Sequence, residues 1–479
     1  MNFLRKEKHT LSDIVRSDMP VGRLQQLRLA VSLSIPAIIA QLSAIIMQYI
    51  DASMVGSLGA GPSASIGLVT TTTWIFMGLC SSAAVGFSVQ VAHLIGSGRA
   101  EGARSVFRQS LAATLLVSVT LAIVGFLISG RLPSWLGGEE GIRENASLYF
   151  RVFALSMPVL QYSYLSSGML RCSGNMVFPG IAGVVMCVLD VVFNFFLIYP
   201  VREVILFGTP VSMPGAGLGV WGAAVGTALA ETVVTALMMW QLVFRSKELR
   251  LWGGGGGFRL RGECMRRAFR IGFPMGVERF LTSGAQVVLT MIVAPLGACS
   301  IAANAFAVTA ESMCYMPGYG IADAATTLVG QSLGAGRKWL ARQFAYTCVG
   351  MGMAVMSVMG VVMYVSAPSI IGLMSPDEEI VRLGVMALRT EAWGEPMYAV
   401  AIVAYGAFVG AGDTVIPSCF NLGCMWGIRI ILASLLAPVY GLHGVWIAMC
   451  VELICRGTLF LLRLRTTYWM RRIDKINEK

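Results

Sequence analysis

The 479-residue chain is poor in charged side chains, which make up 13% of it. A soluble domain carries about 25%, so this composition excludes a soluble enzyme, a nucleic-acid-binding domain and a disordered scaffold. The only three histidines are His9, His93 and His443, which we expect in tails and loops rather than in a buried proton relay. The eleven cysteines form no C-x-x-C pair, and no H-E-x-x-H motif occurs. We therefore expect no structural metal site, no disulfide and no metalloenzyme centre.

Hydrophobic residues are abundant instead, at 56% of the chain with a mean hydropathy of +0.72. A helix that crosses a bilayer needs about 20 mostly apolar residues. Twelve runs meet this length, and we predict an all-α integral membrane protein with twelve transmembrane helices. The predicted spans are residues 29–54, 64–92, 105–130, 146–170, 176–199, 217–244, 268–295, 299–330, 343–366, 385–410, 414–436 and 441–462.

The basic residues indicate how these spans are oriented. The net charge is +11, and 27 of the 36 Lys and Arg residues fall in tails or loops on one predicted side. Cytoplasmic loops carry the excess of Lys and Arg. We therefore predict a multi-pass protein of the cell (inner) membrane with both termini in the cytoplasm. The positive charge sets topology, and we expect no nucleic-acid partner.

The chain repeats itself at an offset of 238 residues. Pro36 aligns with Pro274, and the turn Gly96–Arg99 aligns with Gly334–Arg337. The repeat predicts two six-helix bundles in the same orientation, a transporter architecture in which substrate binds between the halves. The predicted segments are a cytoplasmic tail at 1–28, an N-lobe at 29–244, a Gly/Arg-rich cytoplasmic linker at 245–267, a C-lobe at 268–462 and a cytoplasmic tail at 463–479. Five consecutive glycines, Gly253–Gly257, make the linker a flexible tether.

Several short motifs, taken in order, resemble the multidrug and toxic compound extrusion (MATE) family over nearly all twelve spans. They are Pro36 with Asp51 and Val55-Gly56, Gly96–Arg99, Tyr315–Gly318, Leu328–Gln331 with Gly334–Gly336, Glu395-Pro396 and Gly410–Thr414. The resemblance implies a secondary transporter whose two lobes form a V that opens alternately to each side. It implies export of amphipathic, often cationic compounds in exchange for H⁺ or Na⁺. We expect no enzymatic activity, no cofactor beyond the coupling ion, and function as a monomer in the bilayer.

Polar residues from three N-lobe spans are predicted to lie at a similar depth. Asp51 is in the outer half of span 1, Asp190 and Asn194 are one turn apart in span 5, and Thr227 is in span 6. Ionisable residues inside a membrane are costly and mark functional sites. Oxygens of these four residues could bind Na⁺, or the two carboxylates could share a proton. The resemblance also implies a cation-coupling site here, with the span-5 pair in reversed order. Glu231, one turn beyond Thr227, is a further candidate for this network.

Pro36 gives span 1 a bending point, because proline donates no backbone hydrogen bond. The resemblance implies that span 1 bends when Asp51 is protonated, with Pro36 as the hinge. Pro274 occupies the equivalent position in span 7, but the residue that aligns with Asp51 is Leu289. We therefore expect the two lobes to differ in chemistry.

The C-lobe carries its own set of acids within or near spans. Glu278, Glu311 and Glu395 are candidates for substrate attraction or for a second coupling site, and Arg429 could neutralise one of them. We interpret Asp323 and Glu391, which are nearer the span ends, as solvated or structural. Simpler explanations hold for other charges: Glu452 and Arg456 at i,i+4 spacing as an ion pair, Asp413 as a turn or helix-cap residue, and Arg279 as a residue that points about 100° away from Glu278.

Three other functions remain open from the sequence. A flippase or exporter for a lipid-linked or other endogenous precursor is the nearest alternative, but only Arg279, Arg429 and Arg456 are basic residues within spans. A passive channel would leave the acid cluster unexplained. A membrane enzyme lacks a recognisable catalytic motif.

Overall fold

The computed structural model describes residues 11–17, 20–206, 209–251 and 260–473. The predicted glycine tether at 253–257 lies outside the described residues, as do 1–10 and 474–479. The elements are α1 Leu11–Arg16, α2 Arg23–Gly56, α3 Ala60–Gly96, α4 Ala100–Ser129, α5 Leu132–Trp135, α6 Glu140–Cys172, α7 Val177–Ile198, β1 Pro200–Leu206, β2 Thr209–Ala216, α8 Gly219–Trp240, η2 Gln241–Arg245, α9 Gly262–Val293, η3 Ala294–Leu296, α10 Ala298–Gly334, α11 Lys338–Met374, α12 Glu378–Glu391, α13 Glu395–Gly410, α14 Val415–Cys424, η4 Met425–Ile430, α15 Ile431–Tyr440, α16 Leu442–Arg465 and η5 Tyr468–Ile473.

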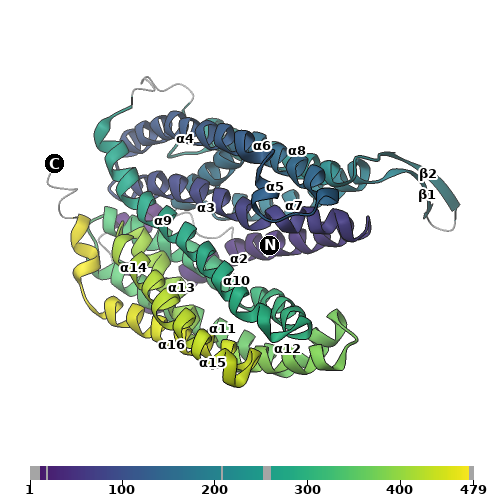
Figure 1. Ribbon diagram of the computed structural model, residues 1–479. Helices are drawn as coiled ribbons and strands as arrows, with labels where there is room; N and C mark the ends of the chain where they lie inside the picture. The colour runs from purple at the N-terminus through teal and green to yellow at the C-terminus, as the bar shows by residue number, and fades with distance from the viewer. Residues whose placement is uncertain (1–10, 18–19, 207–208, 252–259, 474–479) are drawn as a thin grey trace.

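The protein is an all-helical membrane protein with two lobes, as the sequence predicts. Figure 1 shows helices α2 to α8 in the upper part of the molecule, and helices of the second half, α11 to α16, in the lower part. Within the described residues, nine helices are long and apolar enough to cross a bilayer. The count of twelve spans remains a prediction.

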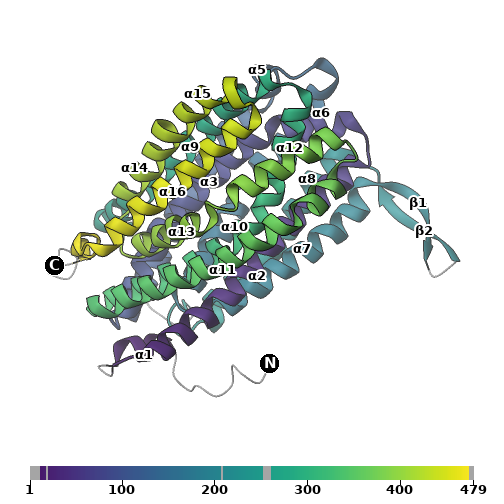
Figure 2. The ribbon, with the colours of Figure 1, turned by 90° about the horizontal axis from the view of Figure 1, so that it is seen from below.

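Three local features differ from uninterrupted spans. The predicted span 385–410 is broken between α12 and α13, where Trp393 and Gly394 precede Glu395-Pro396. Proline is tolerated in the first turn of a helix and disfavours helix at the residue before it. The predicted span 414–436 contains the π-helical segment η4. The connection after α7 is the antiparallel hairpin β1–β2, which projects beyond the helices in Figures 1 and 2.

The repeat is visible in the contacts between the lobes. A Cβ at Gly96 would stand 2.1 Å from the Gln331 carbonyl oxygen, and one at Gly334 would stand 2.1 Å from the His93 carbonyl oxygen. The 238-residue offset aligns Gly96 with Gly334 and His93 with Gln331, so the repeat relates one contact to the other. His93 is buried at the end of α3, with Nε2 2.7 Å from the Gly410 carbonyl oxygen. The expectation that all histidines lie in tails and loops is therefore wrong for His93, because the lobes close around this helix end.

Glycines also set the positions of helices inside the N-lobe. A Cβ at Gly180 of α7 would stand 2.7 Å from the Pro36 carbonyl oxygen, and one at Gly183 would stand 3.2 Å from the Cα of Ala40 in α2. Helices α2 and α7 therefore run side by side in parallel. This packing carries the outer half of α7 to the level of Asp51.

Candidate functional site

Asp51, Asp190 and Asn194 meet inside the N-lobe, as the sequence predicts from their depth. The Asn194 amide nitrogen donates to Asp51 Oδ1 at 2.8 Å and to Asp190 Oδ2 at 3.1 Å. The Asp51 and Asp190 carboxyl groups are also in hydrogen-bonding reach of each other. Asp190 and Asn194 are fully buried, and Asp51 is half-buried. One buried amide therefore bridges two carboxyl groups from different helices.

Thr227 and Gly226 bring α8 to this cluster. The Thr227 hydroxyl is within reach of Asp190 and also donates to the Ala223 carbonyl oxygen at 3.1 Å. A Cβ at Gly226 would stand 2.1 Å from Asn194 Oδ1, so only glycine leaves room for the amide. Among the described atoms, Asp190 Oδ1 and Asn194 Oδ1 have no hydrogen-bond partner. Buried acceptors without partners are costly and mark a place for a proton or a cation. Glu231 lies at the edge of this cluster, in reach of the Ser163 hydroxyl.

Pro36 lies 15 residues before Asp51 on the same helix, and α2 is helical on both sides of it. Its packing against Gly180 connects any bend at Pro36 to α7, which carries Asp190 and Asn194. The predicted hinge is thus mechanically linked to the polar cluster.

Glu278 stands apart from the other C-lobe acids. Its carboxylate accepts hydrogen bonds from the Tyr405 hydroxyl at 2.7 Å, from the Ser418 hydroxyl and from the Asn421 amide at 2.6 Å. These donors come from α13 and α14, so the carboxylate joins three helices. With three donors in place, Glu278 has the contacts of a satisfied structural carboxylate.

Glu311, Glu391 and Glu395 form a second cluster deep in the C-lobe. Glu311 lies beside the Glu391 carboxyl group, and Glu395 lies beside Cys314. The three acids are 5%, 0% and 0% exposed, and both oxygens of Glu391 and Glu395 lack a partner among the described residues. Glu391, which we expected near a span end, lies at the centre because the break between α12 and α13 places it and Glu395 on either side of the gap.

Two arginines provide the positive charge of this C-lobe cluster. Arg429 and Arg456 are both electrostatic neighbours of Glu311. Arg429 Nη2 also lies 2.7 Å from Met449 Sδ. Arg456 lies 5.2 Å over the Tyr398 ring and pairs with Glu452 at 3.0 Å, as its i,i+4 spacing predicts. The cluster is therefore a set of partly compensated buried charges.

Two acids that we interpreted as structural or turn residues form ion pairs. Asp323 of α10 pairs with Arg171 at the end of α6, across the lobes. Asp413 pairs with Arg463 of α16. Both pairs lie toward the end of the molecule that carries the Gly96–Arg99 and Gly334–Arg337 turns. They hold that end of the molecule together.

Arg279 lies next to Glu278 in the sequence but has different surroundings, as the predicted 100° between the two side chains implies. Its side chain is exposed, and its neighbours are tyrosines of both lobes, Tyr164, Tyr319, Tyr398 and Tyr405. Its position inside a predicted span was the signal in the sequence that could have marked it as a functional residue. Which helices and side chains it faces could not be predicted from the sequence.

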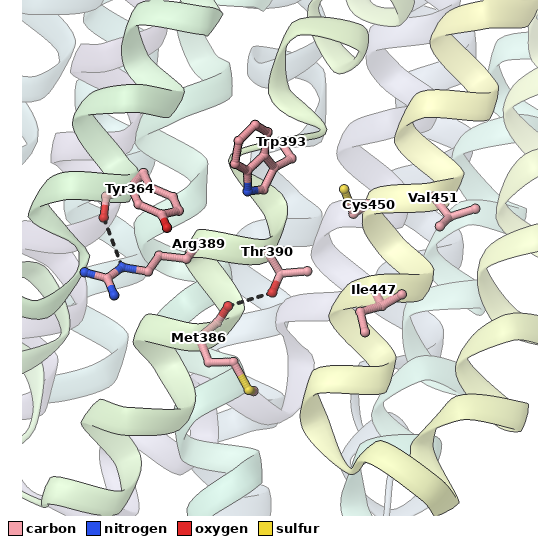
Figure 3. A pocket seen from close by; sticks show the side chains of 8 residues that line it. All are labelled: Tyr364, Met386, Arg389, Thr390, Trp393, Ile447, Cys450 and Val451. Atoms are coloured by element: carbon pink, nitrogen blue, oxygen red, sulfur yellow. Dashed lines mark hydrogen bonds between the residues drawn. The ribbon is translucent and has the colours of Figure 1, made fainter.

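One pocket of about 540 Å³ lies outside the region between the lobes. Figure 3 shows its lining from α11, α12 and α16, with Arg389 Nε donating to the Tyr364 carbonyl oxygen at 3.3 Å. In Figure 2 these three helices form the face of the C-lobe that is turned away from the N-lobe. The pocket therefore faces away from the interface where a substrate would pass.

Two repeated helical lobes with buried acids inside them are typical of a membrane transporter. A family model for MatE matches residues 36–196 and 274–435, most of both lobes. The chain belongs to the MatE family. The first residues of the two matched segments are 238 apart, the same offset as the internal repeat.

Curated relatives match almost end to end. The chain is 24% identical over 451 residues to "Probable multidrug resistance protein NorM" of Thermotoga maritima, covering 94% of each chain. It is 26% identical over 456 residues to "Multidrug resistance protein MdtK" of Yersinia pestis, covering 93% of this chain and 96% of the relative.

Solved structures have the same fold. A MOP superfamily transporter from Pyrococcus furiosus superposes with a TM-score of 0.85 at 20% identity, covering 99% of this chain and 100% of the other. The Vibrio cholerae MATE transporter VcmN in its bent form gives 0.82 at 18% identity, covering 94% and 98%. At these identities the matches show a shared fold.

Proposed function

We propose that this protein is a secondary active multidrug efflux antiporter. It exports amphipathic, often cationic compounds in exchange for a cation, and the two lobes alternate access between the sides of the membrane. The observation that carries this proposal is the buried Asp51–Asn194–Asp190 cluster, which has unpartnered oxygens inside the lobe. The protein acts as a monomer with both termini in the cytoplasm, since its basic loops lie on that side.

The geometry favours H⁺ over Na⁺ as the coupling ion. The nitrogen of the Asn194 amide faces both carboxyl groups, while its oxygen faces Gly226. Na⁺ held by oxygens of Asp51, Asp190, Asn194 and Thr227 would require this amide to turn over. A proton shared between two adjacent carboxyl groups requires no rearrangement. Proton binding then neutralises the Asp51 carboxylate on α2, and this loss of charge favours bending of the helix at Pro36.

The C-lobe acids supply a second coupling site in this scheme. Glu311 and Glu395, with Glu391 between them, form a buried group of carboxyl oxygens without hydrogen-bond partners among the described residues. Arg429 limits the negative charge there. Glu278 contributes to substrate binding only indirectly, by holding Tyr405 beside the space between the lobes.

The experiment uses the full-length protein in proteoliposomes with ethidium as the cationic substrate. H⁺ and Na⁺ gradients are imposed separately, and ethidium movement is followed by fluorescence. We expect movement under the H⁺ gradient, its loss in Asp51→Asn, and retention in Glu379→Gln, an exposed acid at the start of α12. Equal transport by Asp51→Asn and the unmodified protein under either gradient would refute the coupling role.

A further inference from the structure

Arg279 extends from the C-lobe to the N-lobe near the middle of α9. A Cβ at Gly78 of α3 would stand 3.1 Å from Arg279 Cβ and 3.3 Å from its Cγ. The residue at the equivalent position of the N-lobe, by the 238-residue offset, is Gln41. The Gln41 amide reaches across the lobes in the same way, to Asp323 Oδ2 at 3.4 Å. Both positions therefore face the opposite lobe.

The guanidinium of Arg279 lies in the space between the lobes. Its titratable neighbours include Tyr319 of α10, Tyr398 and Tyr405 of α13, and Tyr164 of α6. Three of these rings belong to the C-lobe and one to the N-lobe. Because the Arg279 side chain is also exposed, this space is open rather than filled by protein.

A polar stripe on α9 leads outward from Arg279. Ser283, Gln286 and Thr290 follow it at helical spacing and share its face. Gln286 and Thr290 are exposed, although they lie in the outer half of a helix whose other exposed residues are mostly apolar. Exposed polar side chains inside a bilayer face water rather than lipid. The stripe thus marks a water-accessible route from the outer side to Arg279.

No carboxylate within the described part of the chain forms an ion pair with this arginine, although Glu278 is close enough to act on its charge. Glu278 is its sequence neighbour, but the Glu278 carboxylate is bonded to Tyr405, Ser418 and Asn421. Asp323 is paired with Arg171. The Ser283 hydroxyl donates to the Arg279 backbone carbonyl oxygen at 3.1 Å, but no hydrogen bond or ion pair from the described residues reaches the guanidinium. Its five N–H donors are therefore free to bind a ligand.

We propose that Arg279 binds an anionic group of the exported compound, a carboxylate or sulfonate attached to an aromatic body. The planar guanidinium accepts a carboxylate in a bidentate geometry, and the surrounding tyrosines supply apolar ring faces and hydroxyls. A single arginine close to the Glu278 charge suits one negative charge rather than a diphosphate. This inference rests on the proposed transport function and adds aromatic anions and zwitterions to the compounds that the protein exports.

The test uses three probes that share one ring system: pyrene butyrate, pyrene butanol and pyrene butylamine. Binding to the purified full-length protein in detergent is measured by energy transfer from its tryptophans to pyrene. We expect butyrate to bind more tightly than butanol. A charge-assisted hydrogen bond contributes enough that Arg279→Gln should weaken butyrate binding by about ten- to hundredfold. Arg279→Lys should restore part of it.

Controls separate this inference from folding and from transport. Arg389→Gln removes a cation on the opposite face of the C-lobe and should change no affinity. Butylamine should bind Arg279→Gln as well as the unmodified protein, which shows that the variant is folded. Equal affinities for butyrate and butanol in the unmodified protein, or an equal loss for all three probes in Arg279→Gln, would overturn the anion site. Failure of the proposed function is recorded separately, as absence of gradient-driven ethidium transport in proteoliposomes.

Discussion

The two lobes are copies of one bundle that have kept the same contacts and acquired different chemistry. Gly96 and Gly334 make matching approaches to Gln331 and His93. In contrast, Asp51 of the N-lobe aligns with Leu289, which is packed in an apolar cluster. Positions where backbones touch leave no room for variation, whereas interior polar positions can change if their partners change with them.

The chemical difference between the lobes lies in how each organises its acids. The N-lobe places two carboxyl groups around one amide on unbroken helices. The C-lobe gathers Glu311, Glu391 and Glu395 around a helix break and adds two arginines. The first arrangement suits binding and release of one cation. The second is a group of buried carboxyl groups whose negative charge is partly compensated by Arg429 and Arg456.

The largest effect is expected when an acid of the N-lobe cluster is compared with an acid of the C-lobe cluster. Asp51→Asn should abolish H⁺-driven ethidium transport, because it removes one of the two groups that share the proton. Glu311→Gln should reduce transport only in part, since Glu391 and Glu395 remain. The measurement is initial transport rate against the imposed pH gradient in proteoliposomes. Complete loss in Glu311→Gln with retention in Asp51→Asn would reverse the roles assigned to the lobes.

A smaller effect tests whether the lobes are equivalent where they touch. Gly96→Ala and Gly334→Ala each force a methyl group against a backbone carbonyl of the other lobe. We expect each to destabilise the protein by about 1–3 kcal/mol, and by similar amounts. Thermal unfolding in detergent measures both, with Gly350→Ala as the control because its surroundings are open. Clearly unequal losses would argue against symmetric closure.

The next prediction concerns the contact between Gly226 and the Asn194 amide in the N-lobe. Gly226→Ala should shift the Asn194 amide and cost about 1 kcal/mol, less than the backbone clashes, because a side chain can move. Transport should fall more than stability does, since the amide holds Asp51 and Asp190 in place. The Val220-Trp221 pair recurs as Val445-Trp446 at an offset of 225 residues, so the residue that aligns with Gly226 in the C-lobe is Val451, which is exposed. A Gly226→Ala variant with normal transport would show that the amide position is not critical.

The smallest effect is expected outside the lobes' interiors. Arg382 donates two hydrogen bonds to Glu379 on the exposed start of α12, and these bonds lower the pKa of Glu379. A lowered carboxylate pKa gives stability that is present at neutral pH and is lost as the pH falls through that pKa. Because the pair is solvent-exposed, Arg382→Gln should leave transport and neutral-pH unfolding temperature nearly unchanged. A large loss would mean that the outer end of α12 takes part in transport.

The depth of a polar residue along its helix could be predicted from the sequence. For the N-lobe site, depth alone was enough to predict which residues meet. Asp51, Asp190 and Asn194 each lie in the outer half of a predicted span, and parallel packing of α2 and α7 brings them together. The C-lobe was less predictable, because Glu391 could be placed correctly only with the break before Glu395. No hydropathy pattern marked that break, although the Glu395-Pro396 pair is a local signal for it.

The sequence alone determined that this is a membrane protein of two repeated lobes, because hydropathy and internal repetition are properties of the chain itself. It also determined that Asp51, Asp190 and Asn194 lie at a similar depth. Only the tertiary structure decided which residues at one depth meet, because that depends on the rotation of each helix about its axis. Glu278 and Arg279 show this most clearly. They are adjacent in sequence, yet one is bonded within the C-lobe and the other extends toward the N-lobe.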